Sequence, residues 1–137
     1  MTIEEFVRKN TGKKVDYDGV FGAHCVDLFR QYALDVLGIP EHTGSCATSG
    51  GAKDLYLDYN KMPLEKKYFS KITNKSFVPG DVLVWDESGT NKFGHVAIYL
   101  GSLNNDFIVF EQNGITQDGA KIALRSRERL LGGLRKK

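Results

Sequence analysis

Residues 16–27 read DYDGVFGAHCVD, and their cysteine stands where an acidic, glycine-containing loop gives way to a helical pattern. From Cys25 onward, apolar residues recur at the three- and four-residue intervals of an amphipathic helix, which Gly38 and Pro40 bring to an end. A thiol at a helix N-terminus lies at the positive end of the helix dipole, which favours the nucleophilic thiolate. Cys25 is therefore a candidate nucleophile.

Around this helix the chain divides into a helical first half and a strand-rich second half. Thr2 and Glu5 predict a capped first helix, and another short helix is expected within residues 52–59. Beyond Pro63 the pattern becomes one of short strands, expected at residues 68–72, 81–85, 95–100, 107–111, 121–124 and 130–134. The pair Asp118-Gly119 indicates a hairpin turn between the isoleucines on either side of it. Helices followed by strands predict an α+β domain whose N-terminal helices pack on an antiparallel β-sheet.

The composition is that of one globular domain. The 137 residues are 41% hydrophobic and 26% charged, which allows a single core but no second full domain. A formal net charge of +2 is too small to indicate a nucleic-acid partner, and no stretch reads as a membrane span or a signal peptide. One pair of cysteines, Cys25 and Cys46, is no disulfide framework, so both are expected to be free thiols. We expect a monomeric single domain over residues 1–137, with no membrane insertion.

A base and an orienting group follow the nucleophile in the sequence. His95 begins an expected strand and is preceded by Gly94, whose missing side chain leaves space. If the Cys25 helix packs across the sheet, His95 can take the thiol proton and later protonate a leaving amine. Glu111 ends an apolar strand, and Glu111 or Asn113 would fix the histidine tautomer, since both leave an extended strand on the same side. The alternatives are a structural histidine, an exposed strand-end carboxylate and a turn asparagine.

The acidic loop before Cys25 suggests a second function. Counted from Asp16, the residues Asp18, Val20, Gly22 and Asp27 have the spacing of ligands in an EF-hand calcium loop. The loop departs from that pattern in having no carboxylate at the fifth position, an aromatic residue in place of the turn glycine, and Asp at the last position. Bound calcium would fix the loop that leads into the nucleophile. An Asp-rich turn without metal is the alternative.

Together these motifs resemble the CHAP domain, the cysteine, histidine-dependent amidohydrolase/peptidase family of bacterial cell-wall lysins. The resemblance spans nearly the whole chain and rests on four stretches in order: residues 16–28, PGDV at 79–82, GHVAI at 94–98 and EQN at 111–113. It implies a papain-like α+β fold and an enzyme that cleaves amide bonds in peptidoglycan.

The resemblance also implies roles for individual residues. Cys25 is the nucleophile, His95 the general base and acid, Glu111 the orienting carboxylate, and Asn113 a further polar member of the site. The acidic loop is similar to the calcium site of a phage-lysin subgroup, with side-chain ligands Asp16, Asp18 and Asp27 and the carbonyls of Val20 and Gly22. His24 departs from the family, because many relatives place Gln before the nucleophile.

The family's chemistry predicts a thioester mechanism on a cell-wall amide. We favour an endopeptidase over an N-acetylmuramoyl-L-alanine amidase. The alternative from another class is a noncatalytic, calcium-dependent wall-binding or virion structural domain, and a third is a papain-like intracellular peptidase or acyltransferase. With no signal peptide, a phage origin is expected: synthesis in the host cytoplasm and release to the wall through holin-type pores, or carriage on the virion. No separate cell-wall-binding domain is expected.

Overall fold

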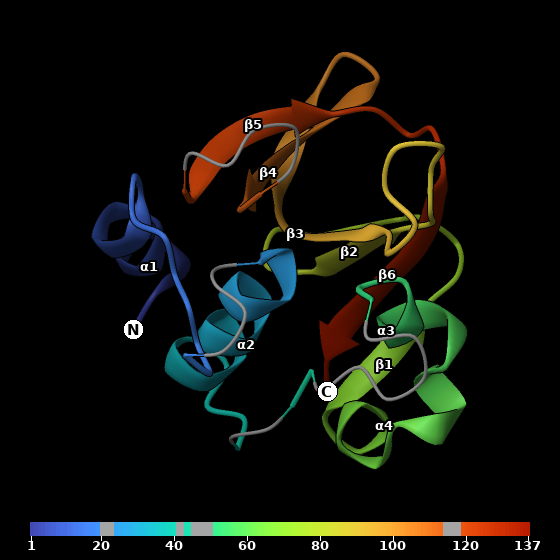
Figure 1. The fold of residues 1–137 in the computed structure, drawn as a ribbon, viewed down its shortest axis with the longest axis horizontal. Helices are drawn as coiled ribbons and strands as arrows, with labels where there is room; N and C mark the ends of the chain where they lie inside the picture. Colours follow the sequence, from blue (N-terminus) through green and yellow to red (C-terminus); the bar gives the residue numbers. More distant parts are fainter. Residues whose placement is uncertain (20–23, 41–42, 45–50, 114–118) are drawn as a thin grey trace.

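The computed structural model describes residues 1–19, 24–40, 43–44, 51–113 and 119–137. Within these residues, four helices and a short 3-10 turn precede all of the strands: α1 (Ile3–Asn10), α2 (Cys25–Asp35), α3 (Asp54–Leu57), η1 (Tyr59–Lys61) and α4 (Pro63–Tyr68). The strands are β1 (Phe69–Ile72), β2 (Val82–Trp85), β3 (His95–Leu103), β4 (Asp106–Glu111), β5 (Lys121–Arg125) and β6 (Leu130–Lys136). All six expected strands are confirmed, each within a few residues of its expected ends (Figure 1).

Short-range hydrogen bonds explain where the first two helices begin. The Thr2 hydroxyl accepts from the Glu5 backbone N–H at 3.1 Å, and the Glu5 carboxylate accepts from the Thr2 N–H at 3.0 Å. This reciprocal capping box is the predicted one. At α2, the His24 N–H donates to Asp27 Oδ2 at 2.9 Å, and the Asp27 N–H donates to the His24 carbonyl at 3.1 Å. Cys25 is thereby the first residue of α2, as predicted.

One local expectation is wrong. Pro63 does not end the helical half but begins α4, because proline is pre-organised for the first turn of a helix, where its missing N–H is not needed. β4 and β5 are antiparallel neighbours, with Ile122 opposite Phe110, and the turn expected at Asp118-Gly119 stays a prediction. Asp118 itself lies outside the described residues.

The strands form a six-stranded sheet in the order β1-β6-β2-β3-β4-β5, and every neighbouring pair is antiparallel. Helix α2 packs against β3, whereas α3 and α4 lie beside β6 and β1 (Figure 1). The predicted α+β class, with N-terminal helices on an antiparallel sheet, is confirmed. Among the described residues, none of the helices combines the length and the apolar character that crossing a membrane requires.

The predicted alternation along β3 places its residues in two separate cores. Val96 and Ile98 belong to the larger core beneath the helices. Ala97 and Tyr99 belong to a smaller core on the other face, together with Trp85 from β2. The ring of His95 lies 5.9 Å from that of Trp85, so His95 borders this smaller core at the start of β3.

The pairing of β3 with β4 stops before the start of β3. The last paired residues at this end are Ile98 and Phe110, so the segment 95–97 pairs with β2 alone. Gln112 follows β4 here and is buried; its amide donates to the His24 carbonyl at 2.9 Å and to the Val15 carbonyl at 2.7 Å. Gln112 therefore ties the end of β4 to the segment that leads into Cys25, at the point where the two strands separate.

Candidate active site

Cys25 and His95, distant in sequence, form a hydrogen bond between α2 and β3. Burial by itself would raise the pKa of the Cys25 thiol, but the hydrogen bond and the charge of His95 outweigh it. The backbone N–H groups of Val96 and Val26 also donate to the sulfur, and the pKa falls below its ordinary value. The N–H of Val96 is available because β3 has parted from β4 at this point. The site therefore favours a thiolate.

His95 is held on its other side by Glu111. The distance from His95 Nε2 to Glu111 Oε1 is 3.1 Å, and both side chains are buried. Burial would lower the pKa of His95, but the hydrogen bonds of Cys25 and Glu111 raise it above its ordinary value. An ionised carboxylate only accepts, so Nε2 carries the proton and Nδ1 is left to face the sulfur. With Nε2 protonated, the neutral ring can take the thiol proton at Nδ1, and this transfer gives a thiolate–imidazolium pair.

Arg125, on β5, completes the surroundings of Glu111. Its Nε lies 2.6 Å from Oε1 and its Nη2 lies 3.4 Å from Oε2, and its guanidinium lies over the Trp85 ring at 5.9 Å. Burial would raise the pKa of Glu111, but its hydrogen bonds to His95 and Arg125 lower it. The sequence analysis did not identify Arg125 as a member of the site. Its Cα stands opposite Phe107 rather than Glu111, so strand pairing gave no signal for this contact.

Asn113 does not leave the strand beside Glu111 as expected. The strand ends at Glu111, and Asn113 has a φ of 52°, in the left-handed region. The condition for two side chains on one side, an extended backbone, is therefore not met. Glu111 is the residue that the structure brings to His95, while a role for Asn113 remains a prediction.

The three predicted acidic ligands lie together in front of α2. One carboxylate oxygen each from Asp16, Asp18 and Asp27 lies within 4.8 Å of the others. Burial raises the pKa of Asp27, and the negative charges of Asp18 and Asp16 raise it further. Arg30 approaches Asp18 at 3.5 Å and offsets part of this charge. Oxygen donors gathered in this way fit a hard cation such as calcium. The other two predicted ligands, Val20 and Gly22, lie outside the described residues.

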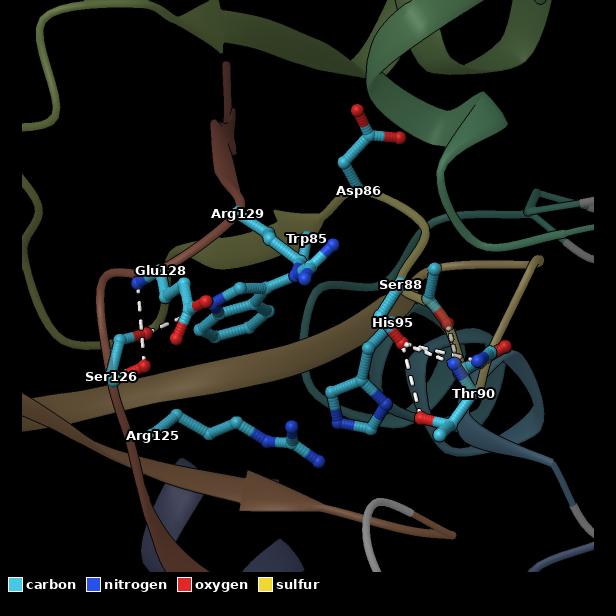
Figure 2. A pocket seen from close by; sticks show the side chains of 11 residues that line it. Trp85, Asp86, Ser88, Thr90, His95, Arg125, Ser126, Glu128 and Arg129 are labelled. Atoms are coloured by element: carbon cyan, nitrogen blue, oxygen red, sulfur yellow. Dashed lines mark hydrogen bonds between the residues drawn. The ribbon is translucent and has the colours of Figure 1, made fainter.

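A cleft of ≈ 570 Å³ opens beside His95. Figure 2 shows His95, Arg125 and Trp85 gathered along it. Its other lining residues are mostly polar: Asp86, Ser88, Thr90, Asn91, Gly94, Ser126, Glu128 and Arg129. The volume suits a short peptide segment, and the polar lining offers hydrogen-bond partners to peptide groups.

The stretch of the chain that contains Cys25, His95 and Glu111 matches a known family. Residues 14–113 match the CHAP domain. The chain belongs to the CHAP domain family. It is also similar to the D-alanyl-L-alanine endopeptidase of Streptococcus phage B30, with 29% identity over 99 residues, which cover 72% of this chain and 21% of that protein.

Two solved structures share the fold of this CHAP domain. The wild-type endolysin LysIME-EF1 is 20% identical with a TM-score of 0.66, covering 98% of this chain and 64% of its own. Ly7917 is 18% identical with a TM-score of 0.65, covering 99% and 62%. The papain-like α+β prediction is thereby confirmed. The chain spans 21% of the curated relative and less than two thirds of either solved chain.

Proposed function

We propose that this CHAP domain is a peptidoglycan hydrolase that cleaves a cell-wall amide bond with Cys25 as its nucleophile. The supporting observation is the hydrogen-bonded series Cys25, His95 and Glu111, which adjoins a peptide-sized cleft. A noncatalytic wall-binding or virion structural domain is the competing function. It gives no reason for a thiol whose pKa is lowered by a histidine and by two backbone N–H groups.

The proposed reaction begins with attack of the Cys25 thiolate on the amide carbon. His95, as imidazolium, then protonates the leaving amine, and a thioester remains on Cys25. A water that gives its proton to His95 hydrolyses the thioester and restores the thiol. The backbone N–H of Cys25 has no partner within the helix at this first position, so it is a natural donor to the oxyanion. In this scheme Glu111 orients His95, and Asn113 is a further polar member of the site.

The bond that we favour is a peptide bond within the stem or cross-bridge, which makes the domain an endopeptidase rather than an amidase. The support is the similarity to a phage protein described as a D-alanyl-L-alanine endopeptidase. A phage origin agrees with this similarity, with release to the wall through holin-type pores or carriage on the virion. We propose that residues 1–137 act on peptidoglycan as one monomeric catalytic domain.

We further propose that Asp16, Asp18 and Asp27 hold a calcium ion, with carbonyl oxygens of Val20 and Gly22 completing the site. The clustered carboxylate oxygens and the raised pKa of Asp27 show a concentration of negative charge that a cation would relieve. Bound calcium supplies positive charge and rigidity beside the start of α2. It is not a participant in the bond cleavage.

Clearing of purified Gram-positive cell walls tests the proposed function. Wild type should clear the walls, Cys25→Ala should not, and Cys46→Ala, which removes the other thiol, should behave like wild type. Mass spectrometry of the released ends then identifies the bond: new termini within the peptide support an endopeptidase, whereas free muramic acid ends would make it an amidase. Equal results for wild type and Cys25→Ala on a broad panel of walls would favour the noncatalytic alternative.

A further inference from the structure

Glu111 is a buried carboxylate shared by two donors. Its Oε1 accepts from His95 Nε2 at 3.1 Å and from Arg125 Nε at 2.6 Å, while its Oε2 is 3.4 Å from Arg125 Nη2. The side chain of Glu111 is 3% exposed and that of Arg125 is 21% exposed. The contacts thus extend the series Cys25, His95 and Glu111 by one residue, and that residue comes from a different strand.

A two-point contact with a planar guanidinium does more than balance charge. It fixes the rotation of the carboxylate about its last bond, because both oxygens are engaged by one rigid group. The rotation that brings Oε1 toward Nε of Arg125 is also the one that brings it toward His95. A buried carboxylate that lost its cation would be driven to turn or to take up a proton, and either change would weaken its hold on His95.

Other charged groups lie near this series without the same contact. Asp86, Glu128 and Arg129 line the cleft, and Arg129 donates to the Glu87 carbonyl at 3.3 Å. Lys121 stands opposite Glu111 in the strand register. Within the part of the chain that the structure describes, the ion pair to Glu111 from a permanently charged side chain is that of Arg125.

We propose that Arg125 is a positioning residue, which locks the Glu111 carboxylate in the orientation that holds His95 against Cys25. The inference rests on the proposed roles of Cys25, His95 and Glu111. Arg125 acts through Glu111, so its contribution should vanish when Glu111 can no longer form the ion pair.

The test is the rate at which iodoacetamide alkylates Cys25 at neutral pH. It is measured in a Cys46→Ala background, so that only Cys25 can be alkylated. Arg125→Gln should slow alkylation about tenfold or more, the loss expected for one hydrogen bond to a charged group. Arg125→Lys should recover part of the rate, because it restores the positive charge but not the two-point contact of the guanidinium with Glu111. Arg127→Gln is the matched control: Arg127 donates to the Asn105 carbonyl, outside the series, and its loss should leave the rate unchanged.

A double variant decides between positioning and a general structural effect. In a Glu111→Gln background, Arg125→Gln should add little further loss. An undiminished tenfold loss there, or a wild-type rate for Arg125→Gln alone, overturns the proposal. If Arg125→Gln does not fold by circular dichroism, the same comparisons are made with Arg125→Lys. A wild-type rate for Arg125→Lys with Glu111 intact, or an equal loss in the presence and absence of Glu111, overturns the proposal.

Alkylation needs no cell wall, so this experiment stands apart from the proposed hydrolase function. The expected alkylation pattern without wall clearing would overturn the hydrolase and keep the positioning role. Wall clearing that depends on Cys25, together with an alkylation rate insensitive to Arg125, would do the reverse.

Discussion

Replacement of Gly94 by alanine should destabilise the fold at the residue that precedes His95. Gly94 has a φ of +77°, a left-handed conformation that favours glycine. A Cβ at this position would lie 2.5 Å from the Trp85 carbonyl oxygen and 2.9 Å from Cβ of Lys53. The space expected beside His95 is therefore not open: the backbone of β2 and the side chain of Lys53 fill it.

The magnitude follows from two contributions. The left-handed conformation costs a non-glycine residue about 1–2 kcal/mol. Contact with a backbone oxygen cannot be relieved by a rotamer change, and such overpacking costs about 1–3 kcal/mol more. Gly94→Ala should thus lose about 2–5 kcal/mol of the roughly 5–15 kcal/mol that stabilises a domain. Gly12 offers a matched control, because its φ is +82° and nothing lies within 4 Å of an added Cβ. Gly12→Ala should lose only the first contribution.

Urea unfolding of both variants measures the difference, with the free energy of unfolding extrapolated to zero denaturant. Alkylation of Cys25 measures whether His95 has moved, and it should slow in Gly94→Ala alone. Equal losses of stability in the two variants would refute the reasoning, since they would mean that the close contact with Trp85 constrains nothing.

The remaining predictions concern the site. Glu111→Gln should keep the fold but reduce wall clearing by about 10²-fold or more, through poorer orientation of His95; unchanged turnover would remove Glu111 from the mechanism. Because the pKa of Glu111 is lowered in the folded state, its ionised form adds stability that is present above the unfolded pKa of about 4.5 and lost as pH falls through the folded value. The stability gap between wild type and Glu111→Gln should therefore shrink in acid, as urea unfolding at neutral and acid pH will show. Removal of divalent cations with a chelator should lower both the melting temperature and the clearing rate, and added calcium should restore them. Asp18→Asn should lose this response to calcium, and full activity in excess chelator would contradict the calcium proposal.

The sequence predicted those parts of the fold that depend on local patterns. The strand β3 was found from its alternation, and the start of α2 from the change of pattern at Cys25. The helix α4 was missed because Pro63 was interpreted as a break, although proline at the first turn is compatible with a helix. Proline can either interrupt a helix or begin one, and the residues next to Pro63 do not decide between these two roles.

The sequence predicted the three hydrogen-bonded residues of the candidate site but not the residues that hold them in place. Cys25, His95 and Glu111 were identified by residue type and order, and the structure brings them together. Arg125 and Gln112 were not. Arg125 contacts Glu111 on the neighbouring strand out of register, and Gln112 contacts the segment before α2, so no sequence period relates either residue to its partner. Such contacts depend on how the strands curve and where a ladder stops, and these features are properties of the assembled sheet.

The position of β6 has a consequence for how the domain is made. It is the last strand in the sequence, yet it lies between β1 and β2 and pairs with both. Until residues 130–136 arrive, β1 has no partner and one edge of β2 stays open. The strand that carries His95 is paired to that same β2. A growing chain should therefore complete the sheet that supports His95 only after β6 has been inserted, and the thiol of Cys25 would stay inactive until then.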